Sequence, residues 1–485
     1  MTQMDKTSFE AVIGLEVHIQ LLTRSKAFCS DATTFGAMPN TQTGIVSLAH
    51  PGTLPKANVK HIELALRLGL ALECSISDRT YFDRKHYFYA DLPKGFQTTQ
   101  DKQPICVGGV FKIGSGENRR AIRIHHIHME EDAGKSMHEP ESDASLIDYN
   151  RAGVPLLELV TEPDLRTSAE VFEFINKLRQ LVRYLKVSDG NMEEGSLRAD
   201  CNVSIRPVGS TELNTRCEIK NVNSARYAAK AVDYEIERQL KLVVKGRDVE
   251  QQTREYIPSE NKTLPLRGKE EAHDYRYFPE PDLPPIFIPA EELARIKESL
   301  PILPNVWFRR FQAEYQLSDY DAELLVEQRP VAEMFHDFCS SHPAVVPTSF
   351  SKLVINKILP FCKETGISVR DFPILDQNIV DFLSLINRDE ISSSVAYQKL
   401  WPAMMKAKST PSELAQELNL IQSFDESYIR TSIQAVLLEN PDKVKAYTKG
   451  KKALLSFFIG QVMRRTNGKA NPKVTRETLL SLLDS

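Results

Sequence analysis

The chain has 485 residues, of which 41% are hydrophobic and 26% are charged, which is typical of a globular protein with about three domains. Its formal net charge of −4 excludes a generally basic nucleic-acid-binding protein, so any such contact must come from a local patch. The seven cysteines are scattered and form no CxxC pair, no apolar run reaches membrane-spanning length, and the start carries no signal or transit pattern. We therefore expect a cytoplasmic protein with reduced thiols that does not bind a membrane.

The first expected strand is Ile13–Leu21, in which polar and apolar residues alternate. Glu16, His18 and Gln20 share one face of it. A single histidine in such a strand is more often structural than functional, so this element does not identify a site by itself.

Residues 28–54 are rich in proline and glycine and are expected to form a loop. The apolar residues within 57–71 indicate a helix. The next segment, Phe82–Phe96, combines aromatic residues with Arg84, Lys85, His86 and Lys94. This mixture is suited to stacking on bases or clamping phosphate, although aromatic strands more often form core.

The strand expected from Ile124 ends in three carboxylates, Glu130, Glu131 and Asp132. Further on, Glu158 interrupts an apolar run, and a buried carboxylate there needs a partner. Two helices follow, over residues 167–185 and 224–245, and we interpret both as packing elements.

The stretch Asn191–Arg206 alternates most clearly and places Arg198, Asp200 and Asn202 on one face. The segment Thr215–Asn221 does the same with Arg216, Glu218 and Lys220. For one strand alone, a solvent-facing surface is the simpler interpretation. Four strands with mixtures of Glu, His, Asp and Arg favour one polar cavity for a metal and its anionic ligand.

The proline-rich segment 258–304 predicts the end of the first domain, and helical periodicity dominates from about Pro289 onward. Within that segment, Arg267–Pro279 is polar and aromatic, and we assign it to the rim of the cavity. The predicted fold class is α+β, with an antiparallel-sheet domain over residues 1–294, a helical domain over 295–410 and a helical tail over 411–485.

The segment Asn440–Lys473 is locally basic, with Asp442 as its one acidic residue. A solvated helix face and a contact with nucleic-acid phosphates explain this equally well. The nucleic-acid candidates are Lys443, Lys449, Lys451, Lys452, Arg464, Arg465, Lys469 and Lys473.

Several motifs together resemble a known family, the B subunits of the bacterial aspartyl/glutamyl-tRNA(Asn/Gln) amidotransferase (GatB). They are Gly14–His18, Asp91–Gly95, Glu130–Lys135, Asp148–Pro163 and Ala272–Phe278. The segment from Lys449 to Pro472 is similar to the family's YqeY-like tail. The resemblance covers essentially the full chain.

The resemblance implies a glutamine synthetase-like sheet that uses ATP and Mg²⁺ to phosphorylate the side-chain carboxylate of Glu-tRNA(Gln), Asp-tRNA(Asn) or both. Ammonia from the glutaminase, which is the A subunit, then displaces the phosphate, and the C subunit makes the complex a heterotrimer. The rival hypothesis is a non-catalytic tRNA-binding subunit whose carboxylates bind structural cations.

Carried over to this chain, the resemblance implies that Glu16, His18 and Glu131 hold the Mg²⁺. Glu218 and one of Glu194 or Asp200 complete the set, and the choice among Glu193, Glu194 and Asp200 stays open. Arg198 and Lys220 are expected to stabilise the transferring phosphate, and Asp200 and Asn202 complete the expected nucleotide-binding residues.

The chain departs from the family at a zinc site that many members form with paired cysteines in the 28–54 loop. Cys29 remains, whereas the other positions are Asp31, Gly44 and Ser47. A single thiol with a distant carboxylate is not a closed zinc site, so we expect no zinc. His126 replaces a usual arginine, which leaves the role of that position open.

Overall fold

The computed structural model describes residues 8–114, 119–138, 144–220, 222–266, 274–407, 409–421, 426–466 and 469–483. The chain divides into two compact units, Met1–Pro304 and Asn305–Ser485, which we describe separately. Within the described ranges, no helix is long and apolar enough to cross a membrane.

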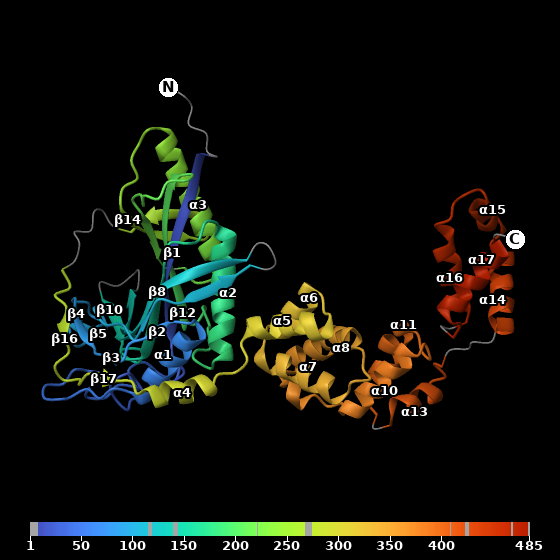
Figure 1. The fold of residues 1–485 in the computed structure, drawn as a ribbon, viewed down its shortest axis with the longest axis horizontal. Helices are drawn as coiled ribbons and strands as arrows, with labels where there is room; N and C mark the ends of the chain where they lie inside the picture. Colours follow the sequence, from blue (N-terminus) through green and yellow to red (C-terminus); the bar gives the residue numbers. More distant parts are fainter. Residues whose placement is uncertain are drawn as a thin grey trace. The chain divides into compact units, whose positions relative to one another are not determined.

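The first unit is built on a 10-stranded sheet, seen in Figure 1. Its strands run in the order β15 (Lys262–Pro265), β14 (Gln252–Ile257), β13 (Cys217–Lys220), β12 (Leu197–Pro207), β1 (Phe9–Gln20), β11 (Pro155–Thr161), β8 (Arg120–Glu131), β6 (Cys106–Val107) and β2 (Ser75–Ile76), and β7 (Val110–Ile113) also pairs with β8. The pairs are antiparallel except for β13 and β14, which are parallel. The expected antiparallel sheet is confirmed with that one exception.

Helices α2 (Ser168–Tyr184) and α3 (Ala225–Val244) lie on one side of this sheet (Figure 1). The Thr167 side chain accepts from the Glu170 amide in a capping box that begins α2. Apolar residues of α2 and of the central strands share one core, to which Phe174 and Val17 belong. Because successive strand residues point to opposite faces, the polar residues of β1 and β12 lie on the other side of the sheet.

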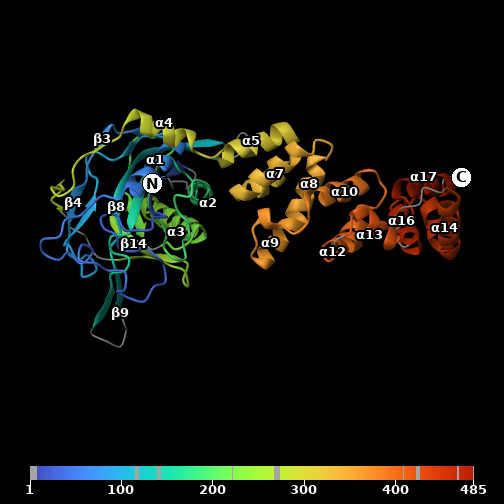
Figure 2. The ribbon, with the colours of Figure 1, turned by 90° about the horizontal axis from the view of Figure 1, so that it is seen from below.

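A small sheet lies on that other side (Figures 1 and 2). It consists of β16 (Phe278–Pro279), β4 (Asp83–His86) and β5 (Phe96–Thr99), and β5 contacts β8 of the main sheet. Two further two-stranded antiparallel sheets belong to the unit. One pairs β9 (Lys135–His138) with β10 (Ser145–Asp148), and the other pairs β3 (Arg79–Thr80) with β17 (Ile286–Phe287).

Helix α1 (Val59–Ala71) packs against β8, and α4 (Ala290–Glu298) packs on α1. Ile296 of α4 is buried in the main core. The first unit therefore continues to Pro304, beyond residue 294 where we placed its end.

The second unit is helical, as expected. Its α-helices are α5 (Pro304–Tyr315), α6 (Asp319–Val326), α7 (Arg329–Ser341), α8 (Pro347–Leu353), α9 (Leu359–Thr365), α10 (Asp376–Asn387), α11 (Ser393–Val395), α12 (Trp401–Met404), α13 (Pro411–Glu417), α14 (Glu426–Glu439), α15 (Pro441–Thr448), α16 (Leu454–Arg465) and α17 (Pro472–Leu483). Short turns of other helix types are η3 (Val354–Ile358), η4 (Val369–Asp371) and η5 (Ala396–Leu400).

The last four helices share their own core, which includes Ile433, Phe458 and Leu479. In contrast, α13 packs against α10 and α12. We therefore propose that the tail begins with α14 rather than at residue 411.

Candidate functional site

A row of polar side chains crosses four neighbouring strands of the main sheet. His18 on β1 lies opposite Arg198 on β12 and opposite Glu158 on β11, and Glu158 lies opposite His128 on β8. Residues directly opposite each other in antiparallel strands point to the same face. Residues far apart in the sequence thus meet on one surface, which we call the polar face.

A second group lies beside that row, toward β13. Glu16 is opposite Asp200, and Asn202 is opposite Glu218. Asn202 Nδ2 donates to Glu16 Oε1 at 2.9 Å, and Lys220 Nζ lies 3.4 Å from Glu218 Oε1. The structure therefore brings these five candidates together.

One set of side chains on the polar face can hold a divalent cation. His18 Nε2 lies 3.3 Å from Glu158 Oε2 and 3.6 Å from Glu130 Oε1. One ligand atom from each of these residues, which we call the cation cluster, lies within 4.8 Å of the others. The separations of 3.3 Å and 3.6 Å are shorter than the roughly 4.2 Å between opposite ligands of an octahedral Mg²⁺, so these atoms are close enough to share one ion.

The ionisation of the cluster reflects both burial and pairing. Burial lowers the pKa of His18, but the hydrogen bond with Glu158 and the charge of Glu130 raise it to about 9. Burial raises the pKa of Glu158, but His18 and His128 together hold it well below its usual value. At neutral pH, protonated His18 and ionised Glu158 therefore form an ion pair within the cluster.

Glu131 does not join Glu16 and His18, contrary to our prediction. Its carboxylate is paired with Lys94 Nζ and accepts from the Thr98 amide at 2.8 Å. Glu130 points to the polar face in its place, because the strand period of two puts adjacent residues on opposite sides.

Glu194 lies in the turn that precedes β12, where its side chain is exposed. Asp200, its alternative, lies on the strand opposite Glu16. Burial chiefly raises the pKa of Asp200 to about 6. Of these two candidates, the structure groups Asp200 with the other site residues.

Arg198 has a buried donor with no hydrogen-bond partner among the described residues, its Nε. Its Nη2 donates to Asp132 Oδ2 at 2.9 Å, and Gln20 Nε2 donates to the same oxygen at 2.9 Å. Asp132 is only 5% exposed. Asp132 thus fixes one end of the guanidinium beside His18.

His126, in place of the usual arginine, extends the histidine row. Its Nε2 lies 3.1 Å from His128 Nδ1, and the two rings stack with centroids 5.2 Å apart. Burial and the two neighbouring histidines lower the pKa of His126 to about 4. A neutral ring at this position supports His128 without adding charge.

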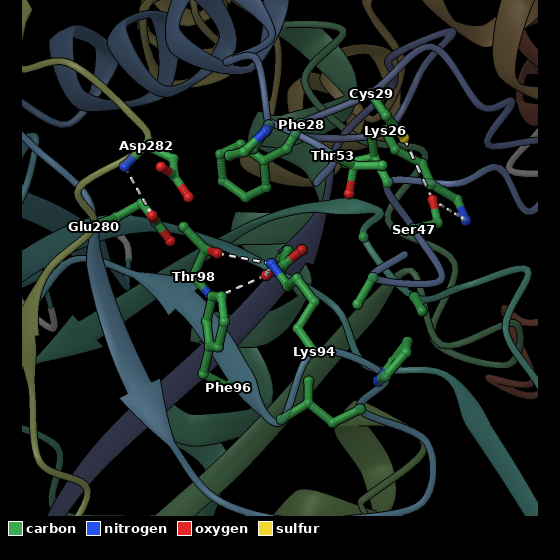
Figure 3. Close-up of a pocket in the computed structure, with 18 of the residues that line it drawn as sticks. Lys26, Phe28, Cys29, Ser47, Thr53, Lys94, Phe96, Thr98, Glu280 and Asp282 are labelled. Atoms are coloured by element: carbon green, nitrogen blue, oxygen red, sulfur yellow. Dashed lines mark hydrogen bonds and ion pairs between the residues drawn. The ribbon is translucent and has the colours of Figure 1, made fainter. Parts of the chain in front are cut away.

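A pocket of about 280 Å³ adjoins the polar face, and Asp132 and Glu131 contribute to its wall. Figure 3 shows the end of Lys94 directed toward Thr98, whose Oγ1 accepts from Lys94 Nζ at 2.8 Å. Arg84 also lines the pocket and is bound to Glu280 by two hydrogen bonds of 2.7 Å. Both of these cations are therefore paired with carboxylates.

The four positions related to the zinc site do lie together, which corrects our expectation of a distant carboxylate. Asp31 Oδ2 accepts from the Gly44 amide at 2.7 Å and from Ser47 Oγ. Ser47 Oγ lies 3.3 Å from Cys29 Sγ and accepts from Lys26 Nζ at 3.3 Å (Figure 3). One thiol and a carboxylate that already accepts hydrogen bonds do not make a tetrahedral zinc site.

The basic candidates of the tail lie on α15–α17 and their connections. Most are exposed: Lys449, Lys451, Lys452, Arg464, Arg465 and Lys473. Lys443 and Lys469 are half-buried, and Lys443 Nζ lies 3.3 Å from the centre of the Phe457 ring. Their contact with nucleic acid stays a prediction.

Some residues of the site were missed at the sequence level. His128 and Glu130 were not chosen, although they share the strand phase of His126. Asp132 and Lys94 were noted in the sequence, but no local pattern indicated that they would pair with Arg198 and Glu131. Part of the expected cavity rim, residues 267–273, lies outside the described residues.

Comparison with known proteins relates both units to one family. Residues 11–294 match the family described as "GatB/GatE catalytic domain", and residues 334–483 match "GatB domain". The B subunit of the aspartyl/glutamyl-tRNA(Asn/Gln) amidotransferase of Thermodesulfovibrio yellowstonii is 44% identical over 475 residues, which cover 98% of this chain and 99% of that protein. The protein of the same name from Pelodictyon phaeoclathratiforme is 45% identical over 476 residues, with the same coverage of 98% and 99%. The one from Salinibacter ruber is 44% identical over 495 residues, covering 98% of this chain and 97% of its own length.

Proposed function

Because the chain belongs to the family of aspartyl/glutamyl-tRNA(Asn/Gln) amidotransferase B subunits, we propose that it phosphorylates the misacylated residue on tRNA before that residue is amidated. The ligase to which it contributes uses glutamine as amide donor and acts in tRNA-dependent transamidation. The proposed substrate is the side-chain carboxylate of Glu-tRNA(Gln), Asp-tRNA(Asn) or both.

The observation that carries the proposal is that Arg198 lies opposite His18, which places a guanidinium beside the cation cluster on the polar face. A carboxylate is a poor electrophile, and ATP makes it reactive by transferring a phosphoryl group to it. That transfer depends on positioning and on neutralising phosphate charge. A cation site and an arginine on one face would supply both.

His18, Glu130 and Glu158 would hold Mg²⁺, which when bound would neutralise charge on the phosphates of ATP. Arg198 and Lys220 would contact the transferring phosphoryl group. Asp132 would position Arg198, and Asn202 would position Glu16.

The proposed reaction has two steps, phosphorylation and amidation. A carboxylate oxygen of the aminoacyl group attacks the γ-phosphorus and ADP leaves, which gives an acyl phosphate. Ammonia then attacks the acyl carbon, phosphate leaves, and the nitrogen loses a proton. We propose that ammonia comes from the glutaminase, the A subunit, and that the C subunit is the third member of the complex, while the basic tail contacts the body of the tRNA.

The test is ATP hydrolysis that depends on misacylated tRNA, measured on the assembled complex. Arg198→Met should lower this rate by about 10²–10³-fold, because it removes a donor to the transferring phosphate, and glutamine hydrolysis should continue. Lys220→Met is the second variant. Because the Lys220 side chain is 45% exposed, this substitution should disturb folding less. Arg123→Met, whose side chain is 64% exposed and pairs with Asp164, is the matched control.

Wild-type complex that amidates tRNA without hydrolysing ATP would overturn the proposal. ATP hydrolysis unchanged in both Arg198→Met and Lys220→Met would also do so. The rival hypothesis, a non-catalytic tRNA-binding subunit with structural cations, would then be favoured.

A further inference from the structure

Two aromatic segments of the sequence, Lys85–Tyr89 and Tyr275–Phe278, take no part in the chemistry proposed above. They lie about 190 positions apart but meet because β16 pairs with β4. The His86 amide donates to the Tyr275 carbonyl at 2.8 Å. The two segments therefore form one continuous surface.

Four tyrosine rings and one lysine make up this surface, which we call the aromatic platform. The ring centroids of Tyr87 and Tyr89 are 5.7 Å apart, those of Tyr87 and Tyr275 are 6.2 Å apart, and those of Tyr275 and Tyr277 are 6.0 Å apart. Lys85 Nζ lies 4.8 Å from the centre of the Tyr275 ring. The rings thus form a chain of contacts with a cation beside it.

The platform is not part of the hydrophobic core. Tyr89 is 55% exposed and Tyr277 is 39% exposed. Arg276, between the last two tyrosines, has a φ of 47° and a side chain that is 81% exposed. A left-handed backbone costs a bulky residue about 1 kcal/mol or more.

The platform is connected to the cation cluster through Gln97 of β5. Tyr87 Oη donates to Gln97 Oε1 at 3.4 Å, and Gln97 Nε2 donates to Glu130 Oε2 at 2.9 Å. A ligand on these rings would therefore be next to the polar face.

We propose that the aromatic platform stacks the unpaired bases at the 3′ end of the aminoacylated tRNA, which would bring the aminoacyl group to the polar face. This inference rests on the proposed function. Aromatic side chains stack on any base, at about 1–3 kcal/mol per base. Lys85 and Arg276 add positive charge for the neighbouring phosphates. Four rings offer more stacking area than a single adenine needs, which favours an RNA end over the base of ATP.

The probe is a short single-stranded RNA with the sequence of the tRNA acceptor end and 2-aminopurine as its last base. Stacking quenches the fluorescence of this base analogue, so titration with the assembled complex measures binding directly. Tyr275→Leu and Tyr277→Leu should each raise the Kd for the probe by about 5-fold to 150-fold. Tyr275→Phe and Tyr277→Phe keep the ring and should bind as the wild type does. Tyr320→Leu, at a 68% exposed tyrosine of the second unit, is the control.

A competition experiment separates the two sources of a base. Displacement of the probe by unlabelled acceptor-end RNA supports the proposal, whereas displacement by ATP alone would assign the platform to the nucleotide and overturn it. With misacylated tRNA, the leucine variants should raise the KM while kcat stays near that of the wild type.

Two outcomes distinguish this inference from the proposed function. Equal probe binding by the wild type and both leucine variants, with tRNA-dependent ATP hydrolysis intact, overturns the platform and leaves the proposed function standing. Probe quenching that is lost in both leucine variants, in a complex that amidates tRNA without hydrolysing ATP, supports the stacking role and overturns the kinase step.

Discussion

Divalent-cation binding to His18, Glu130 and Glu158 should displace a proton, so the affinity of the cation cluster should rise with pH. A histidine must be neutral to ligate a metal. Burial favours the neutral ring of His18, but Glu158 and Glu130 outweigh burial and raise its pKa to about 9. At neutral pH the cation therefore competes with the proton on His18.

The size of the effect follows from the distance between the pH and that pKa. At pH 7, two units below a pKa of about 9, roughly 1% of His18 is neutral. The apparent affinity should then be about 100-fold weaker than at high pH, or roughly 2.7 kcal/mol at 1.36 kcal/mol per unit. Binding should tighten about tenfold per pH unit from pH 7 and level off above pH 9.

Calorimetric titration of the metal-free full chain with Mn²⁺ is the assay. Measurements at pH 7 and pH 8 in buffers of different ionisation enthalpy give both the affinity and the number of protons released, which should be close to one at pH 7. His18→Asn should bind more weakly and with little dependence on pH. Equal wild-type affinities at the two pH values, or no proton release at pH 7, would refute the reasoning.

The same shift affects the stability of the metal-free protein. Since the pKa of folded His18 lies above its unfolded value of 6.5, the stabilisation is complete below pH 6.5 and is lost as the pH rises through about 9. The difference of about 2.5 units corresponds to roughly 3 kcal/mol. The ion pair with Glu158 thus stabilises the fold under the conditions in which it opposes metal binding.

Three further predictions test other parts of the molecule. Glu130→Gln should weaken Mn²⁺ binding by tenfold or more, whereas Glu131→Gln should not, because Glu131 pairs with Lys94; an equal loss in both would place Glu131 in the cation cluster. Elemental analysis should find far less than one zinc per chain, and Asp31→Ala should lower the free energy of unfolding by about 1–3 kcal/mol because its donors lose their acceptor; stoichiometric zinc, or a thermal unfolding curve like that of the wild type, would contradict this. Removal of residues 422–485 should raise the apparent KM for tRNA and flatten its salt dependence while glutamine hydrolysis persists, and an unchanged salt slope would make the basic run a solvated helix face.

Strand periodicity predicted much of the polar face. A period of two fixes which residues of one strand share a side, so Glu16 with His18, and Arg198 with Asp200, followed from the sequence alone. The same rule applied to β8 groups His128 with Glu130. Our choice of Glu131 came from the family resemblance, and the local phase of the strand contradicts the grouping it implied.

The partners between strands were not predictable in the same way. Register and strand order depend on tertiary packing, and no local pattern states that Asp132 will meet Arg198 or that Lys94 will meet Glu131. The meeting of Tyr87 with Tyr275 depends likewise on the pairing of β4 with β16. Sequence patterns therefore identified the chemical groups on each strand more reliably than they identified the strands that lie beside it.

Hydrogen bonds among side chains and the backbone hold the loop beside the pocket. Ser47 lines the pocket and joins Asp31 to Lys26, whose side chain is fully buried. Burial raises the pKa of Asp31, but hydrogen bonds from Ser47 and the Gly44 amide lower it below its usual value. The stabilisation from Asp31 is therefore present above the unfolded pKa of 3.8 and is lost as the pH falls through the lower folded value. Acid should destabilise this loop because it protonates Asp31, whereas a chelator should leave the loop unchanged.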